Sequence, residues 1–277
     1  MLTLHTCHLS EIGGRARNED ACGYWASERS GCWIVSDGAG GHGSGDVASR
    51  LIVTNALQHF KSAPRVTPDA VVALLQAAHE AVVQAKRSGA TRDDMHATAV
   101  ILLLDGLEGD AVWAHVGDTR LYWFRVGRIL HRTRDHSLVQ QMLDAGLAAG
   151  DATREHPKRS ILTAAMGAVG ELPVAWTESA QRVQPGDRFL MCSDGWWEHV
   201  LDAEMEVLLQ VSATPEDWLA RMAELIRARA PSGNDNYTAV CVAVDAPDEL
   251  DQADEREEAD GADQATVLVT TPRSSSA

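Results

Sequence analysis

Four aspartates stand where apolar, strand-like segments meet loops, and they constrain this chain more than any other feature. Asp37, Asp118 and Asp194 each follow such a segment, and Asp235 precedes one. Asp37 and Asp194 also share the tripeptide Ser-Asp-Gly. A single Asp-Gly pair is most simply interpreted as a turn signal. Four such acids together predict carboxylates that converge on one sheet edge, where they repel each other unless cations lie between them.

Oxygen ligands of this kind favour hard divalent ions. Zinc is disfavoured, because no His or Cys stands at structural-site spacing with these acids. A fifth acid comes from residues 15–20. If that segment is extended, Glu19 and Asp20 point to opposite faces, so we expect only one of them to be a direct ligand. Arg15 and Arg17 share a face and can present guanidinium groups to an anion; the alternative is a solvated charged loop.

A glycine-rich loop, residues 38–45, leads directly into a predicted helix. Such loops often hold phosphate, but this one is neither a P-loop nor a dinucleotide fingerprint. We therefore expect its glycines to let the backbone approach a metal, with the Gly38 carbonyl as a ligand. His42 in this loop is either a proton donor or a hydrogen-bonded structural histidine.

The apolar pattern predicts an α+β fold. Helices are expected where apolar residues recur at helical spacing, and Thr67 with Pro68 and Thr214 with Pro215 are helix start signals. Short connections between strands favour antiparallel hairpins, so we expect helices that cover antiparallel sheets. The predicted strands are 32–36, 98–104, 111–116, 121–126, 189–192 and 237–244, and the predicted helices are 45–62, 67–88, 136–146 and 199–230.

Charge divides the chain into two parts. The 277 residues contain 24 Lys and Arg against 40 Asp and Glu, a net charge of −16, which argues against nucleic acid as a partner. Residues 245–263 hold ten acids and one base. We therefore expect one domain over residues 1–244 and an acidic, disordered tail over residues 245–277.

The cysteines and apolar runs indicate the compartment. The five cysteines include no Cys-x-x-Cys pair and lie mostly in apolar stretches, which predicts buried free thiols in a reducing compartment. The longest purely apolar run, residues 99–104, is far shorter than the ~20 residues of a membrane span. No basic stretch followed by an apolar run opens the chain. We expect a cytoplasmic, monomeric protein without membrane contact.

Taken in order, seven motifs resemble the PPM family of metal-dependent protein Ser/Thr phosphatases, which is protein phosphatase 2C-like, and in particular its bacterial branch. The similarity extends over residues ~5–244. The motifs are Arg15-x-x-Asn18-Glu19-Asp20, Asp37-Gly38-Ala39-Gly40-Gly41-His42, Gly117-Asp118-Thr119-Arg120, Asp135-His136-Ser137, His156-Pro157 through Met166-Gly167, Ser193-Asp194-Gly195 and Asp235-Asn236-Tyr237-Thr238.

The resemblance implies a four-layer α-β-β-α sandwich of two antiparallel sheets, with two Mn²⁺ or Mg²⁺ ions at one end. It implies that Asp37 bridges both ions, with Asp20 and the Gly38 carbonyl on one ion. Asp194 and Asp235 would then hold the other ion, and Asp118 together with Asp194 a weaker third one. Arg15 matches a phosphate-binding position, and residues 132–160 correspond to a flap that shapes access.

Three positions depart from the family pattern. Ala39 replaces the usual Met, Asp46 stands where Glu is usual, and residues 163–167 lack a common Arg. In animal relatives the proposed general acid is a His at the position of Ala39, so that assignment does not transfer to this chain. The metal core is expected to be intact, whereas flap contacts and the proton donor are expected to differ.

The implied activity is hydrolysis of phosphoserine and phosphothreonine in proteins by a metal-bridging hydroxide, with Arg15 neutralising charge and water or His42 protonating the leaving group. The enzyme would oppose a bacterial-type Ser/Thr kinase. Two alternatives are a non-catalytic phosphoprotein-binding regulatory module on the same fold, and a phosphatase restricted to regulators of anti-sigma type. Thr266, in the acidic tail, resembles kinase acceptor sites that are recognised by forkhead-associated domains.

Overall fold

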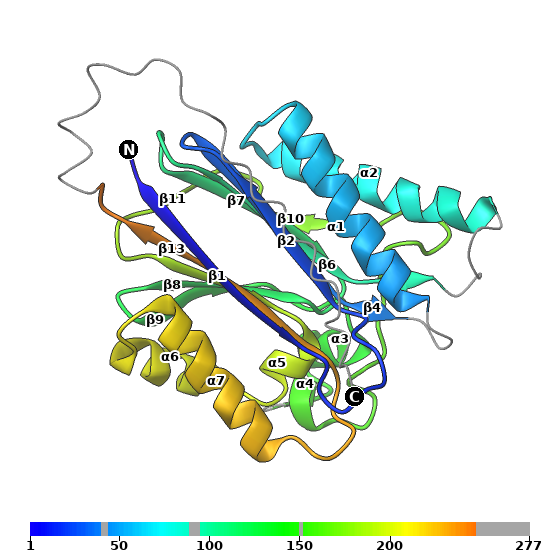
Figure 1. Cartoon of the computed structure of the whole chain (residues 1–277). Coiled ribbons are helices and arrows are strands. Elements are labelled where there is room, and N and C mark those ends of the chain that lie inside the picture. The colour runs from blue at the N-terminus through cyan, green and yellow to red at the C-terminus, as the bar shows by residue number, and fades with distance from the viewer. Residues whose placement is uncertain (40–43, 89–94, 150–151, 248–277) are drawn as a thin grey trace, which may run out of the picture.

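Two antiparallel β-sheets pack face to face, and helices cover both outer faces, as Figure 1 shows. The structure is a computed structural model that describes residues 1–39, 44–88, 95–149 and 152–247. The predicted α+β class with four layers is therefore confirmed. In the described part of the chain, no helix combines the length and the apolar character needed to cross a bilayer.

The first sheet has five strands in the order β1-β13-β12-β8-β9. Its longest pairing joins the two strands nearest the ends of the described chain, β1 and β13, over nine residues. The strands are β1 (Thr3–Glu11), β8 (Arg120–Arg125), β9 (Arg128–Arg132), β12 (Arg188–Cys192) and β13 (Tyr237–Asp245).

The second sheet has the order β10-β7-β6-β3-β2, and a short strand, β11, also pairs with β7. Two further short strands, β4 and β5, pair with each other beside it. The strands are β2 (Ala21–Ala26), β3 (Ser30–Ser36), β4 (Gly38–Ala39), β5 (His96–Ala97), β6 (Ala99–Asp105), β7 (Asp110–Val116), β10 (Ala175–Trp176) and β11 (Gln181–Arg182).

The helices divide between the two outer faces. In Figure 1, α1 and α2 lie on the outer side of the second sheet, and α6 and α7 lie on the opposite side of the molecule, against the first sheet. The helices are α1 (Gly45–Ser62), α2 (Pro68–Arg87), α3 (Leu138–Asp144), α4 (Ala152–Glu155), α5 (Asp194–Trp197), α6 (Asp202–Val211) and α7 (Pro215–Arg229).

Three apolar clusters hold these layers together. One lies between the second sheet and its helices, one between the first sheet and its helices, and one between the two sheets. In the cluster between the sheets, Trp33 is fully buried, and its indole N–H donates to the hydroxyl of Thr6 in the other sheet at 2.8 Å. The two sheets are therefore joined by apolar packing and by a polar contact.

The structure reproduces all six predicted strands within two residues at each end, and it corrects three other points. Strands β1 and β9 were not predicted, because polar residues interrupt their apolar pattern, and the prediction also missed β2. The predicted helix 199–230 is two helices, α6 and α7, since Thr214 caps a new helix by accepting from the Asp217 N–H at 3.2 Å. The last strand ends at Asp245, one residue beyond the predicted domain boundary, and residues 248–277 lie outside the described part of the chain.

Strand register brings the predicted aspartates to one end of the sandwich. Where β2 begins, Ala21 pairs with Ser36 at the end of β3, so Asp20 and Asp37 are neighbours. At the end of β12, Cys192 faces both Ala239 of β13 and Arg120 of β8. Loops carrying Asp118, Asp194 and Asp235 therefore meet at that same end.

The core between the sheets offers a direct stability test. Leu102 of β6 is fully buried there, whereas Leu107 in the following turn is 47% exposed. We expect Leu102→Ala to lower the free energy of unfolding by about 2–5 kcal/mol, since the cavity cannot refill. Leu107→Ala should change it by less than about 0.5 kcal/mol. Urea unfolding of both variants measures this, and equal effects would contradict the assigned core.

Candidate metal centre

A cleft of about 740 Å³ opens at the end of the sandwich where the aspartates gather. It is lined by four of the predicted metal-ligand aspartates, by Gly38 and by Arg15. Asp20, the remaining predicted ligand, is 4% exposed, is absent from the cleft lining and is a neighbour of Asp37. The aspartates in the lining are Asp37, Asp118, Asp194 and Asp235.

Both Asp-Gly pairs need glycine for close backbone approach and not for a left-handed turn. A Cβ on Gly38 would lie 2.3 Å from the Gly45 carbonyl oxygen. A Cβ on Gly195 would lie 2.1 Å from the carbonyl oxygen of Asn236. Neither glycine has a positive φ. The turn interpretation is therefore wrong for these two pairs, and the glycines let neighbouring loops close around the aspartates.

The serine that precedes each Asp-Gly pair ties its strand to a neighbour. Ser36 donates to the Thr98 carbonyl at 2.7 Å. Ser193 donates to the Asp20 carboxylate at 2.7 Å and accepts from the Thr238 N–H at 3.0 Å. Sequence reasoning did not assign these serines a role, although their repetition in the shared tripeptide was a signal.

The arginine-bearing loop is fixed to the start of β13 by Asn236, which the sequence-based prediction also missed. The Asn236 side chain donates to the carbonyls of Ile12 and Arg17 at 2.7 and 2.9 Å, and accepts from the Glu19 N–H at 2.8 Å. Arg15 donates to the Asp235 carboxylate at 2.7 Å while its side chain stays 54% exposed. The loop is therefore rigid, and the guanidinium remains accessible from the cleft.

Burial and mutual repulsion shift the acids toward their protonated forms. Burial, followed by the charges of neighbouring aspartates, raises the pKa values of Asp37 and Asp194 well above the usual range. Burial raises the pKa of Asp20 to about 6. For Asp118, burial and then the Asp135 charge raise the pKa to about 7. Such shifts are expected where carboxylates are assembled for a cation that would favour their charged forms.

The residues present fit a divalent cation. One carboxylate oxygen of Asp20 and one of Asp194 are buried without any hydrogen-bond partner. Buried polar atoms are normally paired, so these two are available as ligands. As the side chains stand, no three His, Cys, Asp or Glu residues in the described ranges are grouped to hold an ion. Ser193 and Arg15 each bond only one carboxylate oxygen, of Asp20 and Asp235 respectively, so the other oxygen of each carboxylate can bind a cation.

The structure describes several other residues that the sequence analysis singled out. Glu19 lines the cleft while Asp20 is buried and absent from its lining, so the two adjacent acids differ in access. Asp46 accepts from Arg50 at 2.6 Å. His42 lies outside the described residues. All five cysteines are free and buried, as predicted.

The sequence of this chain matches a known protein family. The family model for protein phosphatase 2C matches residues 9–236. The chain belongs to the protein phosphatase 2C family. It is 31% identical over 236 residues to a serine/threonine phosphatase, stp, of Listeria innocua, covering 82% of this chain and 90% of that protein.

Solved structures agree with the family assignment. The serine/threonine phosphatase PstP/Ppp of Mycobacterium tuberculosis is 28% identical and superposes with a TM-score of 0.77, covering 89% of this chain and 100% of that one. A structure of the PstP catalytic domain in complex with two manganese ions is 27% identical with a TM-score of 0.75 and the same coverage. The family resemblance predicted from the motifs is confirmed, and the relatives' names favour a phosphatase over a non-catalytic module.

The raised pKa values predict how acidity affects the metal-free protein. A carboxyl group with a raised folded-state pKa binds protons more tightly when folded. It therefore lowers stability progressively as pH rises from the ordinary pKa of 3.8 to its folded pKa, about 6 for Asp20 and about 7 for Asp118, and by a constant amount above that. We expect Asp37→Asn to stabilise the metal-free protein at pH 8 by the order of 1–4 kcal/mol, because it removes a buried like charge. This advantage should shrink toward pH 5.

Thermal unfolding in EDTA, with both proteins compared at each pH, measures this effect. The comparison cancels the buried histidines, such as His115, whose lowered pKa acts in the opposite direction. An advantage of Asp37→Asn that does not vary with pH would contradict the prediction. Mn²⁺ should reverse the order at pH 8 by binding the wild type more tightly.

Proposed function

We propose that this protein is a metal-dependent protein Ser/Thr phosphatase that hydrolyses phosphoserine and phosphothreonine, with Mn²⁺ or Mg²⁺ as its cofactor. The observation that carries the proposal is the cleft at the end of the sandwich, where four aspartates and one exposed arginine meet. The family supports the reaction class, and the two manganese ions of the PstP structure support the cofactor.

The proposed ligands divide into two groups by their place in the fold. Asp20, Asp37 and the Gly38 carbonyl come from the second sheet, and we propose that they hold one ion. Asp194 and Asp235 come from the first sheet and would hold another, with Asp37 between the two ions. Asp118 lies on the connection between the sheets, and together with Asp194 it would hold a weaker third ion.

Bound divalent ions supply charge neutralisation and a water nucleophile at neutral pH. The chain itself supplies orientation. Arg15 is anchored at Asp235 yet exposed, so its guanidinium can bind two oxygens of a phosphate at the cleft. Ser160, the last residue of the flap, and Leu162 just after it also line the cleft, and we propose that they limit access to it. Protonation of the leaving alkoxide is proposed for water or His42.

Removal of one ligand should abolish turnover without unfolding the protein. We expect Asp194→Asn to lower hydrolysis of para-nitrophenyl phosphate and of phosphothreonine peptides by more than about 100-fold, since even indirect partners of metal ligands are worth about 10–100-fold. EDTA should do the same to the wild type, and added Mn²⁺ should restore it.

The control is Asp110→Asn, at the other end of the second sheet, where Asp110 begins β7. It should retain wild-type activity. Full activity of Asp194→Asn, or of the wild type in EDTA, would refute the metal-dependent mechanism. Binding of phosphopeptides without turnover would instead favour the non-catalytic alternative.

Partners and location extend the proposal. We propose that the enzyme acts in signal transduction in the cytoplasm, as a monomer, against a cognate Ser/Thr kinase whose phosphoprotein products are its substrates. The buried free thiols support a reducing compartment. We propose that the predicted phosphatase domain, residues 1–244, also includes Asp245 at the end of β13. We propose that the acidic tail after it is disordered, which its composition supports.

Thr266 in that tail provides a separate test. Acidic residues precede it, the nearest being Asp263, and we propose that the kinase phosphorylates Thr266 and that a forkhead-associated domain then binds it. Mass spectrometry after incubation of the Asp194→Asn variant with the kinase should find phosphate on Thr266. An unmodified Thr266 would remove this partner from the proposal and leave the phosphatase activity untouched.

A further inference from the structure

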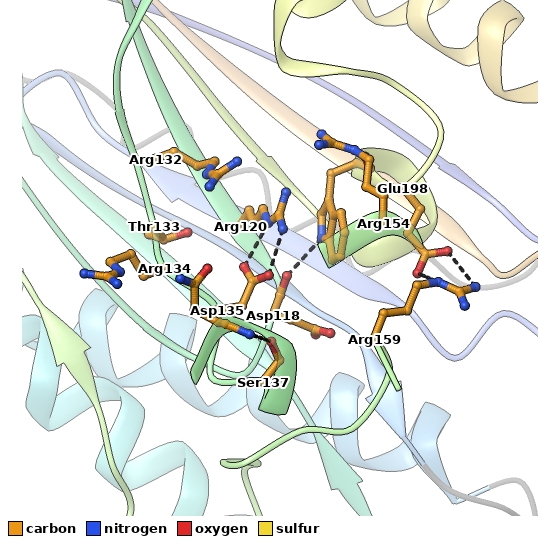
Figure 2. Close-up of polar contacts among 12 residues, drawn as sticks. Asp118, Arg120, Arg132, Thr133, Arg134, Asp135, Ser137, Arg154, Arg159 and Glu198 are labelled. Carbon is orange, nitrogen blue, oxygen red and sulfur yellow. Dashed lines mark hydrogen bonds and ion pairs between the residues drawn. The ribbon is translucent and has the colours of Figure 1, made fainter. Parts of the chain in front are cut away.

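A buried ion pair lies directly behind the cleft, between the strand that follows Asp118 and the base of the flap. Arg120, the first residue of β8, donates two hydrogen bonds to the Asp135 carboxylate, Nε to Oδ1 at 2.8 Å and Nη2 to Oδ2 at 2.7 Å (Figure 2). The two side chains are 1% and 2% exposed. Burying such a pair gives little net stability compared with apolar residues of the same volume, so stability alone gives a weak reason for it.

The guanidinium of Arg120 also lies against a buried aromatic ring, that of Trp197. Its central carbon is 3.6 Å from the ring centroid of Trp197. The indole N–H of Trp197 donates to the backbone carbonyl of Asp118 at 3.0 Å. Trp197 ends the short helix α5, which begins at Asp194. One indole thus connects the backbones of two aspartates that line the cleft.

The other side of the Asp118 loop is held by the flap base. The backbone N–H of His136 donates to the Gly117 carbonyl at 2.8 Å, and the Gly117 N–H donates to His136 Nδ1 at 3.3 Å. His136 directly follows Asp135, the partner of Arg120. The peptide groups on both sides of Asp118 are therefore fixed, one by Trp197 and one by His136.

The flap also contacts Trp197 and Asp202, through a second segment, α4. Arg154 of α4 donates to the Trp197 carbonyl at 2.8 Å and to the Asp202 carboxylate at 2.8 Å. Tyr122 joins Arg120 to Asp202, accepting from Arg120 Nη1 at 3.2 Å and donating to Asp202 at 3.4 Å. The flap, the α5 helix and the Asp118 loop are therefore connected through continuous polar contacts.

We propose that Arg120 and Trp197 are positioning residues for the metal centre. Arg120, clamped by Asp135, holds the Trp197 ring in place, and Trp197 holds the Asp118 backbone at a fixed position relative to Asp194. This inference rests on the proposed function, because it concerns ligands of the proposed ions. The inference specifies that binding of the ion proposed for Asp118 and Asp194 depends on Arg120 and Trp197. Binding of the ion proposed for Asp20 and the Gly38 carbonyl does not depend on them, because those ligands lie in the other sheet.

The same strand carries a matched control at its other end. Arg125, the last residue of β8, makes two hydrogen bonds to the Asp187 carboxylate at 2.9 and 2.7 Å, and lies 4.8 Å from the Trp123 ring centroid. The Trp123 indole N–H is buried without a partner, so its loss breaks no hydrogen bond. Arg125 thus has a carboxylate partner and an adjacent indole ring, as Arg120 does. The Trp123 ring, however, lacks the hydrogen bond to Asp118 that Trp197 makes.

The test measures Mn²⁺ binding to metal-free protein by titration calorimetry, independently of catalysis. We expect Trp197→Phe, which keeps an aromatic ring but loses the N–H, to weaken binding of at least one Mn²⁺ by about 10-fold or more, the size of effect seen for indirect partners of metal ligands. Trp123→Phe should stay within about 3-fold of the wild type, since it loses no ligand contact. Saturating Mn²⁺ should restore most of the turnover of Trp197→Phe, since its chemistry is intact.

Arg120→Lys with Arg125→Lys as its control gives a second comparison. Lysine keeps the charge but not the planar, two-bond geometry or the stacking. Circular dichroism and melting temperature identify variants that do not fold. The proposal predicts that Arg120→Lys binds Mn²⁺ more weakly than the wild type and that Arg125→Lys does not. This difference should hold even when the two variants have the same melting temperature.

The Mn²⁺ affinities of the variants decide whether Trp197 and Arg120 position the metal centre. A folded Trp197→Phe that binds Mn²⁺ like the wild type, or equal weakening in both tryptophan variants, would overturn the positioning role. If Trp197→Phe does not fold, the lysine pair decides in the same way. A wild type that binds no Mn²⁺ and hydrolyses no phosphate ester would overturn the proposed function, and this inference with it.

Discussion

Repulsion among buried carboxylates dominates the end of the sandwich where the cleft opens. Burial raises the pKa values of all four buried acids, Asp20, Asp37, Asp118 and Asp194. One carboxylate oxygen of Asp20 and one of Asp194 have no hydrogen-bond partner in the described part of the protein. Such a group is unfavourable for folding unless cations or protons neutralise it. The surrounding fold must therefore hold the acids in place against their own repulsion.

The sandwich provides that rigidity through loops that cross between its layers. The connection from β7 to β8 passes from one sheet to the other, and Asp118 lies on it. Thr98 joins this connection to Asp37: its N–H donates to the Asp37 carbonyl at 2.8 Å, and its hydroxyl contacts that of Thr119. Apolar packing between the sheets fixes the distance between the two sides, and the polar contacts fix the orientation of each carboxylate.

Much of this could be predicted from local sequence, and the remainder has a common reason for being missed. The central strands are continuous apolar segments, so their pattern alone identified them. Strand β1 carries Thr, His and Ser and becomes a strand through its nine-residue pairing with β13, more than 200 residues away. The roles of Ser193, Asn236 and Trp197 likewise depend on partners that are distant in sequence. Periodicity and spacing do not report on such contacts.

The amino-acid sequence sets the chemistry: which acids stand at strand ends, the glycines beside them, the order of the motifs and the family they indicate. Tertiary structure alone decided which acid faces the cleft and which is buried away from its lining, that the Asp-Gly glycines serve close approach, and that Arg120 and Trp197 connect the flap to Asp118. The physical reason is that residue type sets charge and ligand character locally, whereas access, pKa and orientation depend on atoms contributed by distant segments.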